Sequence, residues 1–291
     1  MEKVIVVARS FQAGTGEGGK EFDPGVFEKQ VATPIRRLLK FEDVVKGIIV
    51  VTNGETGNLL AEIPNAEGIT PTMRAITQMF SHEVTNGRII THLCTNWGPN
   101  PGSAIALNEG LEIAKKEKDI NWILNWSPEI EMDGYLIRQG LAHAEQRNLS
   151  LVGFLRQNWW ERPQWNVVQN TAALWKIKLL SSIDGFSPEC NETDRTIPVE
   201  GFGEVAVAGM EDFHAMLRIL KQNPDFRWGM IGRKEPLFWD TSFKPGSERE
   251  QRHLSKVARQ YAVMQIYTKD IFPELPFEEV MNKIFSCYHQ D

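Results

Sequence analysis

The sequence predicts an α/β protein with a mostly parallel sheet and helices on both of its faces. Short, continuous apolar runs such as KVIVVA at 3–8 and GIIVVT at 47–52 are typical of strands that are buried on both sides. Between such runs, apolar residues recur at spacings of three and four, which is the helical period. Strands and helices alternate in this way through residue 155, a pattern that predicts parallel strands joined by helices.

The expected strands cover 3–8, 47–52, 88–94, 121–125, 151–155 and 227–231. The expected helices cover 24–41, with a bend or break at Pro34, then 71–80, 104–116, 134–147, 211–222, 248–267 and 277–288. Residues that favour a helix start precede four of them: Asp23-Pro24, Thr70-Pro71, Ser103 and Asp133. Residues 156–210 break the alternation. We expect residues 1–240 to form the sheet domain and residues 241–291 a helical C-terminal extension packed on it.

Composition excludes several classes of function. The 291 residues include 32 basic and 38 acidic side chains, a formal charge of -6, so neither nucleic acid nor an anionic membrane surface is a favoured partner. The three cysteines lie far apart with no CxxC, which indicates reduced thiols and a cytoplasmic protein. No apolar run approaches the length that spans a bilayer.

Polar residues follow the expected strands, and ligands of open parallel sheets bind outside the carboxyl ends of the strands. The candidate positions are 9–10, 53–55, 95–96, 127–129 and 156–157. We expect the stretches near 53, 96, 127 and 212 to converge around one cleft.

The glycine-rich segment 14–21 (GTGEGGKE) matches G-x-G-x-x-G and, apart from the final Ser or Thr, the P-loop pattern. Both motifs need glycines that close a strand and open a helix directly. Here other residues intervene on both sides, and Glu21 would bring a carboxylate to the phosphates. We interpret the segment as a surface loop, or as a lid over a substrate.

Two further segments have a structural and a functional interpretation. Asn108 and Gly110 weaken the helix expected at 104–116, although its other small residues suit close packing on a sheet. Glu129, Glu131 and Asp133 follow a buried strand, where carboxylates can hold a divalent cation against a diphosphate. Alternatively, these residues form a turn in which Asp133 caps the next helix.

Read together, these segments resemble the GT-A glycosyltransferases of the family 2 type, over about residues 3–235. The resemblance lies in the order and spacing of four motifs. These are an Asn-x-Gly…Ala-x-Asn-x-Gly-x-x-x-Ala stretch from Asn96 to Ala114, a strand leading into the family's DxD position, the turn Asp184-Gly185-Phe186, and the pair Glu211-Asp212 followed by Arg218.

The resemblance implies a Rossmann-like GT-A fold and an enzyme that takes a sugar from a nucleoside-diphosphate donor. It implies that Asp212, with Glu211 beside it, is the catalytic pair, Asp212 acting as general base toward an acceptor hydroxyl. Expected nucleotide-sugar contacts are Ala8, Arg9, Ser10, Asn53, Glu55, Asn96, Asn108 and Ser127. The Trp-rich stretch lies where the family's acceptor region begins, and its rings suit a sugar face: Trp159, Trp160 and Trp165.

One departure from the family matters. Where the family has Asp-x-Asp, this chain has Asn125-Trp-Ser127 or Ser127-Pro-Glu129. Glu129, with His253 from the C-terminal segment, could still hold Mg²⁺ or Mn²⁺. Alternatively the metal is lost and basic side chains neutralise the diphosphate, namely Arg9, Lys20, Arg156 or Arg162, or catalysis is lost and only binding remains.

We therefore expect a glycosyltransferase that moves a hexose from a UDP- or GDP-type sugar to a carbohydrate or other hydroxyl acceptor, with inversion. The alternatives are a catalytically inactive GT-A-like protein that binds nucleotide sugar, carbohydrate or a partner protein, and a sugar-phosphate nucleotidyltransferase. A homodimer through the last 50 residues is a further alternative.

Overall fold

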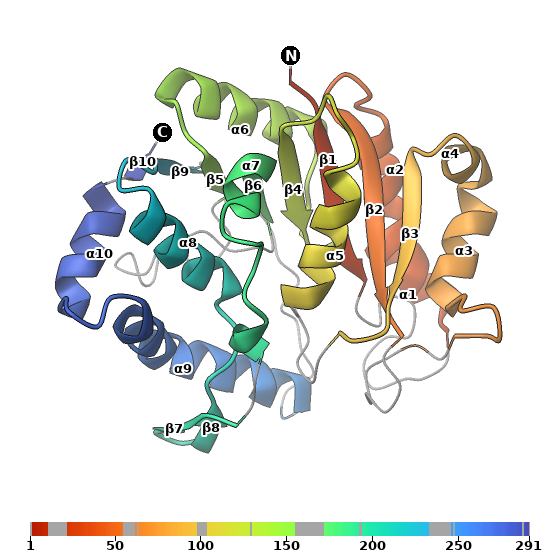
Figure 1. The fold of residues 1–291 in the computed structure, drawn as a ribbon. Helices are drawn as coiled ribbons and strands as arrows, with labels where there is room; N and C mark the ends of the chain where they lie inside the picture. Colours follow the sequence, from red (N-terminus) through yellow and green to blue (C-terminus); the bar gives the residue numbers. More distant parts are fainter. Residues whose placement is uncertain are drawn as a thin grey trace.

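A computed structural model of the chain describes residues 2–10, 22–54, 62, 64–97, 104–128, 130–154, 172–191, 194–232, 246, 248–286 and 288–290. Its main sheet has eight strands: β1 Val4–Ser10, β2 Val45–Asn53, β3 Ile89–Cys94, β4 Trp122–Trp126, β5 Leu151–Phe154, β6 Ala172–Lys176, β9 Trp228–Ile231 and β10 Tyr288–Gln290. Their order is β10-β9-β5-β6-β4-β1-β2-β3 (Figure 1). All neighbours pair in parallel except β6, which runs antiparallel to both β4 and β5. The predicted mostly parallel α/β fold is confirmed.

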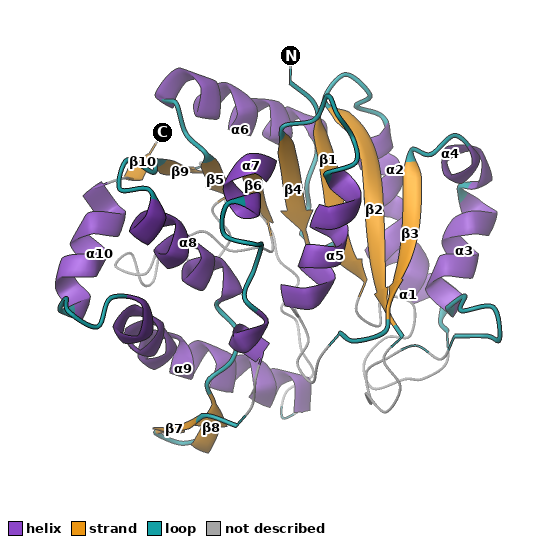
Figure 2. Cartoon of the chain, viewed as in Figure 1, coloured by secondary structure: helices purple, strands orange, loops and turns teal. Residues whose placement is uncertain are grey.

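Helices cover both faces of the sheet (Figure 2). On one face, alternate side chains of β1 (Val4, Val6, Ala8) belong to one core with residues of five helices: α1 Pro24–Phe27, α2 Thr33–Leu39, α3 Pro71–Met79, α4 Ser81–Thr85 and α6 Gly134–Arg147. On the other face, Ile5 and Val7 join a larger core with α5 Ala104–Ala114, α7 Ile177–Ser181, α8 Glu211–Gln222, α9 Glu248–Ile271 and α10 Phe277–Ser286. The alternation along β1 follows from the two-residue period of a strand.

The helix starts follow the capping residues of the sequence. Asp23 accepts hydrogen bonds from the amides of Gly25 and Val26, Thr70 accepts from Met73, and Asp133 accepts from Leu136 at 2.9 Å. A π-helical turn, η1 (Glu28–Ala32), separates α1 from α2 just before Pro34. The backbone therefore stays helical through Pro34, and the irregularity is the π turn ahead of this proline, which cannot donate the helical hydrogen bond.

The structure departs from the predicted elements between 156 and 210 and at the C-terminus. β6 lies in the sheet between β4 and β5, and a separate hairpin of β7 Thr196–Val199 and β8 Gly203–Ala206 precedes α8. The helix expected to reach 288 ends at Ser286, and β10 then adds an edge strand beside β9.

The C-terminal extension shares the core of the sheet domain. Val263, Met264 and Tyr267 of α9 are buried in the same cluster as Phe213 and Leu217 of α8. Lys221 at the end of α8 donates to the carbonyl of Ile271 at the end of α9, at 2.5 Å. Among the described helices, none is both long and apolar enough to cross a bilayer.

Candidate functional site

The carboxyl ends of four strands lie at one edge of the sheet. In the strand register, Ser10 is opposite Thr52, Ala8 is opposite Trp126, and Asn53 is opposite Cys94. Asn96 and Ser127 come just after β3 and β4. The chain therefore brings most of the predicted donor-binding positions to the same edge: Ala8, Arg9, Ser10, Asn53, Asn96 and Ser127.

These positions differ in exposure. The side chain of Asn53 is fully buried, and the backbone carbonyl of Asn53 accepts a hydrogen bond from the backbone amide of Glu62 at 2.9 Å. Asn96 is exposed and Ser127 is half-buried. Among the predicted contacts described at this edge, Asn96 is therefore the most accessible, and Ser127 and Arg9 are partly accessible.

The Glu211-Asp212 pair lies at this same edge. Arg9 Nη1 at the end of β1 is 3.4 Å from Glu211 Oε1 in the first turn of α8, and the two side chains are only 9% and 11% exposed. A partly buried charge needs a partner, so this ion pair fixes the start of α8 against the end of β1. It joins the segment predicted to contact the donor with the segment predicted to carry the catalytic pair.

An unusual turn leads into the pair. Gly209 and Met210 have φ of 83° and 59°, and Met210 occupies the helix start without a side-chain cap. A left-handed conformation is uncommon for methionine and persists only where surrounding contacts fix it. In the first turn, Asp212 Oδ1 accepts from the amide of Phe213 at 2.9 Å. The exposed amides of a helix start stabilise negative charge, so the position suits two carboxylates.

The turn Asp184-Gly185-Phe186 is also left-handed and is held from two sides. Asn108 Nδ2 donates to the carbonyl of Phe186 at 2.7 Å, and Asn108 Oδ1 accepts from its amide at 2.8 Å. Arg218 of α8 donates to the carbonyls of Ile183 and Gly185. Three motifs of the sequence resemblance are therefore tied together by hydrogen bonds.

The half-buried amide of Asn108 holds the Phe186 backbone and thereby positions this turn. The expected contact of Asn108 with a nucleotide sugar stays a prediction. Gly110 is explained by packing, because a Cβ there would lie 2.3 Å from Val7 Cγ1 of β1. An asparagine in a helix interior was the available signal, but the sequence did not reveal its partner.

The carboxylates after β4 have separate roles. Glu131 pairs with Arg37 of α2, and Asp133 caps α6. Glu129 lies outside the described residues, as do Glu55, Trp159, Trp160, Trp165, Lys20, Arg156 and Arg162. The side chains of Ser10 and His253 are likewise not described. In the part of the chain that is described, no group of three or more His, Cys, Asp or Glu side chains could hold a metal ion.

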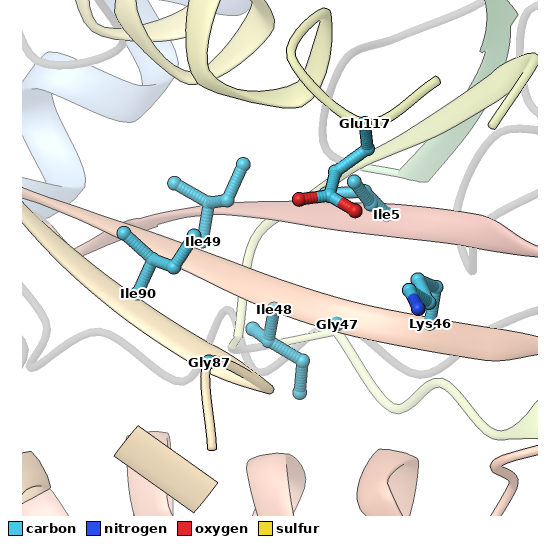
Figure 3. Close-up of a pocket in the computed structure, with 8 residues that line it drawn as sticks. All are labelled: Ile5, Lys46, Gly47, Ile48, Ile49, Gly87, Ile90 and Glu117. Atoms are coloured by element: carbon cyan, nitrogen blue, oxygen red, sulfur yellow. The ribbon is translucent and has the colours of Figure 1, made fainter. Parts of the chain in front are cut away.

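A pocket lies at the opposite end of the strands. It is lined by Ile5, Lys46, Gly47, Ile48, Ile49, Gly87, Ile90 and Glu117 (Figure 3). Ile5 and Gly47 come early in β1 and β2, so this hollow is at the amino ends of the strands. It presents mainly isoleucine side chains, with one lysine and one glutamate, and is separate from the edge that carries Arg9 and Glu211.

Comparisons with known proteins agree with this architecture. No family model matches the chain, and no curated protein matches it in sequence. Among solved structures, S. aureus TarS 1-349 in complex with UDP-GlcNAc is 13% identical, with a TM-score of 0.53 over 98% of this chain and 73% of that one. A longer S. aureus TarS structure is 11% identical, with a TM-score of 0.51, and the match covers 99% of this chain but only 44% of TarS.

A second protein has a similar fold. Glucosyl-3-phosphoglycerate synthase from Mycobacterium tuberculosis, in complex with Mn²⁺, UDP and phosphoglyceric acid, is 12% identical. Its TM-score is 0.50, over 91% of this chain and 78% of that one. The chain therefore has a GT-A-like fold, as the motif resemblance predicted.

Proposed function

We propose that this chain is a glycosyltransferase that moves a hexose from a UDP- or GDP-type sugar to an acceptor hydroxyl, with inversion at the sugar C1. The observation that carries the proposal is the Arg9–Glu211 contact, which holds the acidic pair at the carboxyl edge of a GT-A-like sheet. Ligands of open parallel sheets bind at that edge.

In this mechanism the Asp212 carboxylate accepts the proton of the acceptor hydroxyl. The acceptor oxygen forms a bond to C1 while the bond from C1 to the diphosphate oxygen breaks, and the electron pair leaves with the nucleoside diphosphate. Attack opposite the leaving group inverts C1. A positioned general base contributes about 10²–10⁴-fold to such a step.

Arg9 and Glu211 have supporting roles. Among the described residues, the guanidinium of Arg9 bonds Glu211 with one nitrogen, and its further N–H groups suit phosphate oxygens. Asn96 and Ser127 are proposed to contact the nucleoside and ribose. Trp159, Trp160 and Trp165 are proposed to stack on the acceptor sugar.

The proposed Mg²⁺ or Mn²⁺ would neutralise charge on the departing diphosphate. Glu131 and Asp133 are used by Arg37 and by the α6 helix start, so the described residues do not form a metal site by themselves. Glu129 is the carboxylate of this segment proposed as a ligand, together with His253. No step above depends on the ion.

The test measures nucleoside diphosphate release by purified protein from a panel of UDP- and GDP-sugars, with hydroxyl acceptors, with and without Mn²⁺. We expect Asp212→Asn to lower turnover at least about 100-fold without changing UDP affinity. Asp225→Asn, an exposed carboxylate beyond the far end of α8, is the matched control and should match wild type.

A second candidate is a non-catalytic binder of nucleotide sugars, which the lack of any Asp at the DxD position favours. If the purified protein binds UDP or GDP but turns over no donor, the non-catalytic binder is the correct function. Absence of both binding and turnover would refute both functions. Pyrophosphate release from a nucleoside triphosphate would indicate a nucleotidyltransferase instead.

A further inference from the structure

The segment that leads into Glu211-Asp212 is held by the C-terminal helix α9. Tyr267 Oη donates to the carbonyl of Gly209 at 3.1 Å, and Arg259 Nη1 donates to the carbonyl of Ala206 at 3.1 Å. From the other side, the amide of Gly209 donates to the carbonyl of Cys190 at 2.7 Å. Gly209 is therefore held at both of its backbone polar groups.

The Tyr267 side chain is itself fixed. It is 5% exposed, and the ring of His214 meets it edge to face, with ring centres 5.0 Å apart. His214 lies one turn after Glu211 in α8, so the same tyrosine contacts both the turn and the helix that follows it. Burial raises the pKa of Tyr267, and its hydroxyl therefore stays protonated and can donate at all ordinary pH values.

The turn needs such external contacts. Gly209 and Met210 are consecutive left-handed residues, and no side chain caps the helix at Met210. A strained turn keeps its conformation only when neighbouring groups restrain it. The direction in which Glu211 and Asp212 leave the turn depends on these restraints.

We propose that Tyr267 is a positioning residue, whose hydroxyl fixes the Gly209 carbonyl and thereby the orientation of the Glu211-Asp212 pair. The catalytic part of this inference rests on the glycosyltransferase function proposed above. It gives the C-terminal extension a role in the reaction besides that proposed for His253, and this role does not require Tyr267 to touch the donor or the acceptor.

The test compares Tyr267→Phe with a matched control. Tyr267→Phe removes only the hydroxyl and keeps the ring on His214. Lys221→Met removes another hydrogen bond between α8 and α9, the 2.5 Å bond to Ile271. That bond lies at the far end of α8, roughly 15 Å from the acidic pair at 1.5 Å rise per residue.

Two readouts are needed. Amide hydrogen exchange should become faster at residues 209–213 in Tyr267→Phe and not in Lys221→Met. For transfer, Tyr267→Phe should lower kcat about tenfold or more with donor KM unchanged, since a small misplacement of a catalytic group lowers the rate strongly. Lys221→Met should keep kcat close to wild type, even if its melting temperature falls as much as that of Tyr267→Phe.

The outcomes separate the two proposals. If exchange at 209–213 is unchanged in Tyr267→Phe, or if both variants lose kcat equally, the positioning role is refuted. If wild-type protein turns over no donor, the proposed function fails, and faster exchange at 209–213 still decides whether Tyr267 holds the turn.

Discussion

Arg9 and Glu211 lie 202 residues apart in the sequence, and their charged groups are 3.4 Å apart in the structure. The contact links the end of the first strand to the start of α8 across the carboxyl edge of the sheet. It also means that Arg9 faces a carboxylate at the place where a donor diphosphate is proposed to bind. An anion arriving there would compete with Glu211 for the guanidinium.

Replacing Arg9 by Met should weaken UDP binding about 10- to 100-fold, because hydrogen bonds to charged groups contribute about 1.5–3 kcal/mol. Isothermal titration with UDP measures this change. Glu211→Gln is the control, since it disrupts the same ion pair and leaves the cation in place. Equal losses of UDP affinity in the two variants would show that Arg9 serves only to hold Glu211.

Asn108→Ala should lower the free energy of unfolding by about 2–3 kcal/mol, because two hydrogen bonds to the Phe186 backbone are lost and buried groups are left without partners. Denaturant unfolding measures the change. Asn121→Ala removes an exposed amide that bonds Glu2, and should change stability by about 0.5 kcal/mol or less. An equally small effect of Asn108→Ala would contradict the positioning role.

Gly110→Ala should destabilise the protein by about 1–3 kcal/mol, although the same change in an ordinary helix stabilises it by up to about 1 kcal/mol. The reason is the 2.3 Å approach that a Cβ would make to Val7 Cγ1. The double variant Val7→Ala/Gly110→Ala should lose less free energy of unfolding than the two single variants lose together. Additive effects in this double-mutant cycle would show that the two positions do not share a tight contact.

His214 should make stability depend on pH. Burial, with a smaller contribution from the nearby positive charge of Arg218 and an opposing one from Asp270, lowers the pKa of His214 from its usual 6.5 to about 4. Between these values the unfolded chain binds a proton that the folded chain does not. The free energy of unfolding should therefore fall as pH drops from 6.5 towards 4, by at most about 1.4 kcal/mol per pH unit from this residue.

His214→Phe isolates that contribution. Phenylalanine keeps a ring against Tyr267, and His214 Nδ1 has no hydrogen-bond partner among the described residues, so the exchange is expected to be tolerated. Chemical denaturation at several pH values should show a shallower slope between pH 6.5 and 4 in the variant. Identical slopes in the two proteins would contradict the lowered pKa.

Elements with local signals could be predicted from the sequence. The helices at 134–147 and 211–222 have the predicted bounds, because Asp133 or an acidic first turn marks their starts and the apolar spacing continues to their ends. β6 was not predicted. Its sequence AALWK is short, and its antiparallel place between β4 and β5 depends on pairing with distant strands.

The site was predictable in its position but not in its contacts. Parallel topology was enough to place Ala8, Asn53 and Asn96 at one edge. The roles of Asn108 and Tyr267 depend on backbone carbonyls and amides of segments far away in the sequence, and residue type does not reveal such partners. The motif resemblance singled out Asn108 but gave no indication of its bonds to the Phe186 backbone.

A crystal structure of the protein with UDP and Mn²⁺ tests the proposed function most directly. We expect the base and ribose at the carboxyl ends of β1, β2 and β3 beside Asn96, and the diphosphate within hydrogen-bond reach of Arg9. A nucleotide bound at the other end of the strands, in the hollow between Lys46 and Glu117, would contradict the proposed function.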